Sequence, residues 1–151
     1  CSGQVEKNPD YQLTVADVKA WEAKHGPIPA GSFVAMRSDW HKRFADVDSF
    51  YNKDKEGQSH YPGWSLAALK LLFEERKVNA IGHEPPDTDA AASQKEHGFA
   101  CETYVLSTNH FQIELVANLD QVPEAGALLI ATWPKPKGGS GFPARLFAIL
   151  P

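Results

Sequence analysis

Apolar residues recur at helical spacing in two stretches of the chain, and each stretch begins with a residue that caps helices well. The first helix is predicted to begin after Thr14, which can cap its first turn together with Asp17, and to end at Gly26. The second is predicted to begin after Ser65 and to end in the charged residues 74–77. The apolar positions are Val15, Val18 and Trp21 in the first helix and Leu66, Leu69, Leu72 and Phe73 in the second.

Short apolar runs between turn-forming residues predict the strands. Residues 32–37 and 78–82 each follow a predicted helix and are expected to form buried strands. Residues 127–132 are predicted to form another buried strand, and a hairpin-like connection leads to a final strand at residues 144–150. The order of helix, strand, helix, strand and then mostly strands predicts an α/β domain with a mixed sheet. The length fits one domain over residues 1–151.

One acidic residue lies inside a further strand-like run and is the first candidate for chemistry. Residues 111–115, FQIEL, alternate apolar and polar side chains, and Glu114 is among them. A buried carboxylate costs several kcal/mol unless a cation, a proton or hydrogen-bond donors satisfy it. Glu102 lies one short element upstream, so the two carboxylates can converge on one point. Alternation by itself favours the other interpretation, in which Glu114 faces solvent.

A polar and aromatic loop, residues 38–43, follows the first predicted strand. Binding groups in open α/β sheets gather beyond the carboxyl ends of strands, so this loop is a candidate wall of a site. Trp40 within it has two interpretations, as a site residue or as a cap on the core. The polar residues 45–62 are predicted to form a surface excursion that can act as a lid.

The loop after the second predicted strand, residues 83–89, is rich in acidic residues. His83 and Glu84 can position a polar substrate or hold a hard cation, or they can be structural. Asp87 and Asp89 are interpreted as turn caps that accept hydrogen bonds from nearby backbone donors.

Composition limits the classes of partner. The formal net charge is −4, and no basic patch with interleaved aromatic residues occurs, so nucleic acid is not an expected partner. The longest apolar run, residues 125–133, is far too short to cross a bilayer, and no membrane partner is expected. Cys1 and Cys101 are expected to be reduced thiols. Because the chain opens on Cys1 without a methionine, the absence of a leader does not assign a compartment; a cytoplasmic protein is the expectation.

Common catalytic motifs are absent from the sequence. It contains no GxSxG elbow, P-loop, GxGxxG or HExxH motif, and its histidines are scattered without a close metal-ligand pair. The residues by themselves therefore indicate an acidic α/β domain with a carboxylate-lined site.

Four segments nevertheless match motifs of one family, in order and over nearly the whole chain. AGSFVAMRSDWHKRF (30–44) is similar to GD-x-VL-x-RTGW-x-KRW, and YPGWSLAALKLLFEERKVNAIGHEPPDTDA (61–90) to PG-x-S-x-EAA-x-WL followed by GIDTPSID. IELVANLDQVP (113–123) is similar to VENLTNLDQLP, and GGSGFPARLFAIL (138–150) to GGTGSPVRAIAL. The chain thus resembles the cyclase family of metal-dependent hydrolases, which includes kynurenine formamidase and isatin hydrolase.

The resemblance implies a swivelling β/β/α fold and metal-dependent hydrolysis, usually of amide bonds in small, ring-bearing molecules. Glu114 matches the glutamate of VENL, which can ligate a metal in the family. Glu102 stands where some members place a histidine ligand and so departs from the two-zinc arrangement of kynurenine formamidase. An all-oxygen contribution suits Mn²⁺ better than Zn²⁺. Trp40 matches the tryptophan of TGW, which lies near the substrate pocket in relatives.

The family's HxGTHxDxPxH motif, which supplies most metal ligands and the catalytic histidine, does not occur in this sequence. We therefore predict that the chain is the C-terminal portion of a cyclase-family hydrolase, incomplete at its N-terminal side, with its catalytic residues in an N-terminal part. A small-molecule substrate, that N-terminal part and further copies in a homo-oligomer are the expected partners, since a missing half leaves strand edges exposed. The alternative is a non-catalytic binding or assembly module derived from the same fold.

Overall fold

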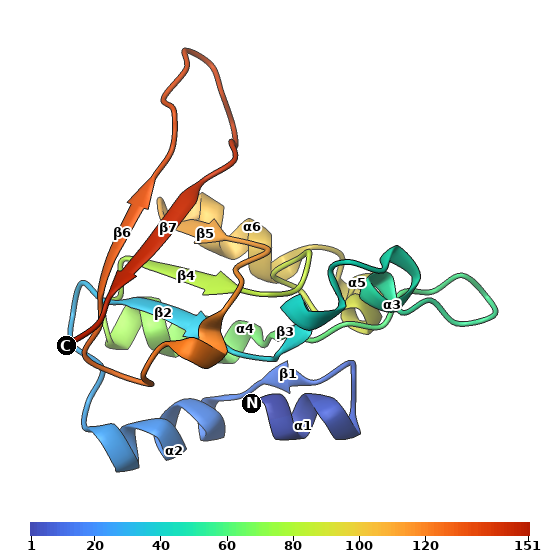
Figure 1. Cartoon of the computed structure of the whole chain (residues 1–151), viewed down its shortest axis with the longest axis horizontal. Helices are drawn as coiled ribbons and strands as arrows, with labels where there is room; N and C mark the ends of the chain where they lie inside the picture. The colour runs from blue at the N-terminus through green and yellow to red at the C-terminus, as the bar shows by residue number, and fades with distance from the viewer.

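The computed structural model describes residues 1–151, and Figure 1 shows its arrangement. The first part of the chain forms α1 (Ser2–Lys7), β1 (Gln12–Leu13), α2 (Val15–His25), β2 (Phe33–Met36), η1 (Trp40–Arg43), α3 (Val47–Tyr51), β3 (Gly63–Trp64), α4 (Leu66–Lys70), the π-helical turn η2 (Leu71–Glu75) and β4 (Ala80–His83). The second part forms η3 (Ala91–Ser93), α5 (Gln94–His97), α6 (Ala100–Ser107), β5 (Phe111–Ile113), η4 (Leu119–Gln121), β6 (Leu128–Thr132) and β7 (Arg145–Ile149).

The strands form three small sheets. The largest has the order β2-β4-β5 with all strands parallel, and its central strand β4 is buried along its whole length. β1 pairs with β3 in parallel, and β6 pairs with β7 antiparallel. The predicted α/β class is confirmed. The parallel and antiparallel pairings are divided among separate sheets because, within this chain, the β6–β7 hairpin pairs only with itself.

Both predicted helices are confirmed at their capping residues. Thr14 Oγ1 accepts a hydrogen bond from the Asp17 amide at 3.2 Å, and Asp17 accepts one in return from the Thr14 amide at 2.7 Å. Gly26 ends α2 with a φ of 85°, a value that few other residues adopt. Ser65 caps α4 through the amide of Ala68. None of the helices is long and apolar enough to cross a membrane.

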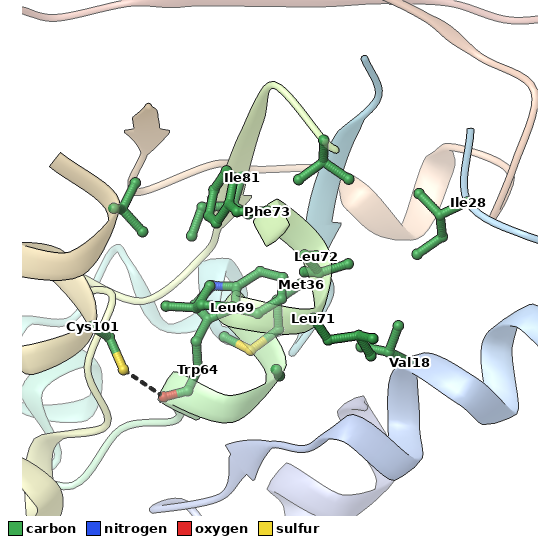
Figure 2. Packing of buried hydrophobic residues seen from close by; sticks show 13 residues of the cluster. Val18, Ile28, Met36, Trp64, Leu69, Leu71, Leu72, Phe73, Ile81 and Cys101 are labelled. Atoms are coloured by element: carbon green, nitrogen blue, oxygen red, sulfur yellow. Dashed lines mark hydrogen bonds between the residues drawn. The ribbon is translucent and has the colours of Figure 1, made fainter. Parts of the chain in front are cut away.

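The main core lies between the β2-β4-β5 sheet and the helices α2, α4 and α6 (Figure 2). Met36 and Ile81 of the sheet share this cluster with Trp64, whose side chain is almost fully buried. The thiol of Cys101 in α6 donates to the backbone oxygen of Trp64 at 3.2 Å, and this hydrogen bond links α6 to β3. The two cysteines are free thiols, as expected.

A second, smaller cluster involves the polar stretch 45–62. This stretch contains α3, whose start is capped by Asp46, and it buries Phe50 and Tyr61 against Trp40. His60 lies between two carboxylates, with Asp10 Oδ2 at 2.6 Å from one ring nitrogen and Asp54 Oδ2 at 3.2 Å from the other. The excursion is therefore partly packed onto the domain by its apolar residues and by His60.

The β6–β7 hairpin forms as predicted, but the prediction that its first strand is buried is wrong for this chain. Leu128 pairs with Ile149, and Ile130 with Phe147, so these four apolar side chains share one face. They are 43–62% exposed, and Figure 1 shows the hairpin extending away from the body of the domain. The apolar pattern is that of a covered strand, yet no segment of this chain covers the face.

Candidate functional site

The carboxyl ends of β2, β4 and β5 lie at the same edge of the parallel sheet, and the chain leaves them in three polar segments. Residues 38–43 follow β2, residues 83–89 follow the body of β4, and Glu114 follows β5. This is the edge where open α/β sheets place their ligands. The candidate side chains from the sequence are gathered around it.

Glu84 is fully buried and holds the loop that follows β2. Its Oε2 accepts hydrogen bonds from the amide of Ser38 (2.8 Å), the hydroxyl of Ser38 (2.8 Å) and the amide of Trp40 (3.0 Å). Its Oε1 lies 2.8 Å from Nδ1 of His41. A buried carboxylate is tolerated when donors satisfy it in this way. Because protein donors occupy both oxygens, the geometry of Glu84 is that of a positioning group for residues 38–41.

Trp40 has the geometry of the core-capping interpretation. Its side chain is 1% exposed and lies in the second cluster with Phe50. The indole Nε1 donates to the backbone oxygen of Phe50 at 2.9 Å, and the Arg43 guanidinium lies 4.1 Å from the ring centroid. Within this chain the ring is enclosed, and its role as a substrate-binding residue stays a prediction.

Asp87 and Asp89 act as the predicted caps. Asp89 accepts from the amides of Cys101 (2.8 Å) and Glu102 (3.0 Å), and so satisfies the first turn of α6 from outside the helix. Asp87 accepts from the Asp89 amide at 3.2 Å and from the side chain of Gln94 at 3.2 Å. Burial, with the nearby charges of Glu102 and Asp89, raises the pKa of Asp87 to about 6.

Glu114 lies immediately beyond the ladder of β5, which corrects the prediction that it is inside the strand. The strand ends at Ile113, and Leu115 has a φ of 56°, in the left-handed region that a leucine rarely occupies. The Val116 amide then donates to the His83 backbone oxygen at 3.0 Å, so the chain folds across the end of β4. This turn leaves Glu114 half-buried at the shared edge.

The Glu114 and Glu102 carboxylates are close enough to interact electrostatically. Burial raises the pKa of Glu114 to about 7, and the charges of Asp87 and Glu102 add to the increase. Glu102 reaches the site from the first turn of α6, because residues 100–107 form a helix. Three carboxylates from three separate segments, those of Glu114, Glu102 and Asp87, are therefore near enough for their charges to repel one another.

His83 is fully buried, as are Glu84 and Thr88 in the same loop. Its Nδ1 lies 3.4 Å from the indole Nε1 of Trp64, and its Nε2 has no hydrogen-bond partner. Glu114 Oε1 is 4.0 Å from that Nε2. Burial lowers the pKa of His83 to about 3, so the ring is neutral. An unpartnered buried polar atom is uncommon in folded proteins and marks this position as one prepared for a further contact.

Two residues that sequence reasoning did not single out complete the arrangement. The Gln112 side chain donates to Glu114 Oε1 at 3.1 Å, and Ser38 supplies two of the donors to Glu84. The period of two along a strand places Gln112 on the same side as Glu114, so that signal was available. The contact of Ser38 with Glu84 joins distant parts of the sequence and left no local signal.

Comparison with known proteins assigns the family. The family model Cyclase, described as "Putative cyclase", matches residues 1–90, more than half of the chain. The chain belongs to the cyclase family. The resemblance of its motifs to that family is thereby confirmed.

This cyclase-family chain is similar to isatin hydrolases along its whole length. It is 40% identical over 152 aligned residues to an isatin hydrolase of Roseibium aggregatum, of which it spans 57%. Its structure matches an isatin hydrolase bound to the product analogue thioisatinate, with a TM-score of 0.93, 39% identity and coverage of 100% of this chain and 57% of the other. The values for isatin hydrolase A from Ralstonia solanacearum are the same. For isatin hydrolase A from Labrenzia aggregata bound to benzyl benzoate, the TM-score is 0.92 at 34% identity, covering 99% and 58%.

The donor set of this cyclase-family chain fits part of a metal site. No three His, Cys, Asp or Glu side chains lie close enough together to hold an ion by themselves. Glu114 and Glu102 nonetheless offer carboxylate oxygens at one edge, beside the buried Nε2 of His83 that has no hydrogen-bond partner. Buried carboxylates close to like charges tend to keep their protons. A bound cation stabilises the ionised form of such carboxylates and takes the place of those protons.

The raised pKa of Glu114 predicts a cost to stability that glutamine would remove. The unfolded carboxyl ionises near its ordinary pKa of 4.5 but the folded one only near 7, so the folded state loses relative stability as pH rises between these values. In metal-free buffer, Glu114→Gln is therefore expected to have a higher Tm than the unchanged chain at about pH 8, and the same Tm below about pH 4.5. Thermal unfolding at both pH values measures the difference. Glu96→Gln, at an exposed position, is the control. If the Tm difference between Glu114→Gln and the unchanged chain were the same at both pH values, the assigned burial of Glu114 would be wrong.

Proposed function

We propose that this cyclase-family chain forms part of a metal-dependent hydrolase that acts on amide bonds, including lactams, or ester bonds of a small, ring-bearing molecule. The observation that carries the proposal is the gathering of the Glu114, Glu102 and Asp87 carboxylates near His83, whose buried Nε2 has no hydrogen-bond partner, at the carboxyl edge of the parallel sheet. Its relatives are hydrolases named for isatin, a cyclic amide, and they share this chain's fold closely. A ring-bearing cyclic amide is therefore the first substrate class to test.

We further propose that the site is completed by an N-terminal part, in the same polypeptide or as a separate chain. The relatives are longer than this chain, which spans 57% of their length. The donors present here are too few for a complete coordination sphere, and the uncovered hairpin face offers a surface for a further layer. Further copies in a homo-oligomer are proposed on the same ground, because the outer edges of β6 and β7 are unpaired.

The chain's own residues have defined tasks in this proposal. Glu114 is proposed as a metal ligand, with Glu102 beside it, and an oxygen-rich contribution favours Mn²⁺ over Zn²⁺. When bound, a divalent cation supplies Lewis acidity toward a carbonyl oxygen and toward water. Gln112 holds Glu114 Oε1, and Oε2, which makes no hydrogen bond within the chain, would be the oxygen available to hold the ion. Glu84 fixes residues 38–41 as a wall of the substrate pocket.

The metal content of the protein expressed from its complete gene distinguishes the metal-dependent hydrolase from a non-catalytic binding or assembly module. The proposal predicts about one or two equivalents of a transition metal per chain by elemental analysis after gel filtration, removable by a chelator. A well-folded protein with no bound metal, and no uptake from added Mn²⁺ or Zn²⁺, would favour the non-catalytic binding or assembly module.

A further inference from the structure

The hydrogen-bond partner of His83 determines where this ring carries its proton. The indole N–H of Trp64 can only donate, so the Nδ1 of His83, 3.4 Å from Trp64 Nε1, accepts and is unprotonated. The ring is fully buried, and it is neutral because an imidazolium has no nitrogen that can accept a hydrogen bond. Its single proton therefore lies on Nε2, and this N–H has no acceptor at hydrogen-bonding distance.

The oxygen that lies near this N–H is already held from another side. Glu114 Oε1 is 4.0 Å from His83 Nε2 and accepts from Gln112 Nε2 at 3.1 Å. Glu114 Oε2 makes no hydrogen bond within the chain. One oxygen of the carboxylate thus faces two N–H groups of the protein, and the other is left free. Repulsion from Asp87 and Glu102 acts on the same carboxylate and would otherwise favour rotation away from them.

We propose that His83 is a positioning residue for Glu114. Trp64 fixes the tautomer of His83, and the Nε2–H of His83 acts with the Gln112 amide to hold Glu114 Oε1, so that Oε2 faces the shared edge of the strands. At 4.0 Å the contact between the His83 Nε2–H and Glu114 Oε1 is electrostatic and longer than a hydrogen bond. This inference deepens the proposed function and rests on the role given there to Glu114. Groups that hold a ligating carboxylate typically change metal affinity by 10–100-fold when removed.

Nuclear magnetic resonance tests the geometry without reference to metal or turnover. In the protein expressed from its complete gene, long-range ¹H–¹⁵N spectra are expected to show His83 as the neutral Nε2–H tautomer from about pH 7 down to about pH 5. Carbon–carbon couplings are expected to show one side-chain rotamer for Glu114 in the unchanged protein and in His83→Gln, whose amide retains an N–H donor. In His83→Leu the Glu114 rotamer is expected to be averaged. A protonated Nδ1, an imidazolium, or a fixed Glu114 rotamer in His83→Leu would each overturn the proposal.

Metal affinity then measures the consequence. His83→Leu is expected to weaken Mn²⁺ binding by about 10–100-fold, with His83→Gln much closer to the unchanged protein. Thr88→Val is the matched control, because Thr88 is fully buried in the same loop and its hydroxyl also lacks a partner, but it makes no hydrogen bond to Glu114. Equal affinity in His83→Leu and Thr88→Val would overturn the positioning role. Absence of Mn²⁺ binding in the unchanged protein would contradict the proposed function, while the rotamer measurement would still decide the role of His83.

Discussion

Replacing Glu84 by leucine is expected to lower the free energy of unfolding by about 3–5 kcal/mol, or to prevent folding. The substitution removes the acceptor of the Ser38 amide, the Ser38 hydroxyl and the His41 Nδ1, while all of these groups remain in place. The Trp40 amide loses its shorter contact, at 3.0 Å, and keeps only the Ser38 hydroxyl at 3.3 Å. Buried donors that lose their acceptor retain the cost of desolvation. Urea denaturation followed by tryptophan fluorescence measures the loss.

A second substitution keeps the test informative if the leucine variant does not fold. Glu84→Gln retains one acceptor oxygen and the shape of the side chain, so a smaller loss of about 1–3 kcal/mol is expected. Glu96→Gln makes the same chemical change on a side chain that is 80% exposed and is expected to alter stability by less than about 0.5 kcal/mol. If Glu84→Gln and Glu96→Gln were equally stable, the assigned role of Glu84 in holding residues 38–41 would be wrong.

Glu114→Gln is expected to lower metal-dependent turnover by about two to three orders of magnitude without unfolding the protein. Glutamine has nearly the same shape and can still meet Gln112, but it has no negative charge to offer a divalent cation. The same change is expected to raise stability above about pH 7 in metal-free buffer, because it removes a carboxylate that is ionised at a cost. Lower activity together with higher stability separates a functional carboxylate from a structural one.

The helices were predictable because their signals are local. Thr14 with Asp17, Gly26 and Ser65 act within a few residues of themselves, and the structure uses each as expected. The convergence of residues 38–43, 83–89 and Glu114 was predictable for a related reason, since parallel strands end at the same edge. The end of β5 was misplaced because alternation does not reveal the left-handed turn at Leu115.

The contacts that determine how each site residue is used could not be read from the sequence. Glu84 is satisfied by a serine 46 positions away, and His83 receives its hydrogen bond from a tryptophan 19 positions away. Such pairings depend on the packing of β2, β3 and β4, which no spacing rule specifies. The exposure of the β6–β7 hairpin could not be predicted either, because an apolar pattern shows that a strand suits a covered environment without showing which chain supplies the cover.

Hydrolysis of a cyclic amide by the metal-loaded protein, compared with that by Glu114→Gln, is the decisive test of a catalytic metal site at Glu114. The protein expressed from its complete gene is loaded with Mn²⁺, and the consumption of isatin is followed by its absorbance, with and without a chelator. The proposal predicts turnover that is lost with the chelator, is restored by Mn²⁺, and falls by about two to three orders of magnitude in Glu114→Gln while Glu96→Gln remains active. Turnover of equal rate in Glu114→Gln and the unchanged protein would contradict the assignment of this carboxylate to the catalytic metal site.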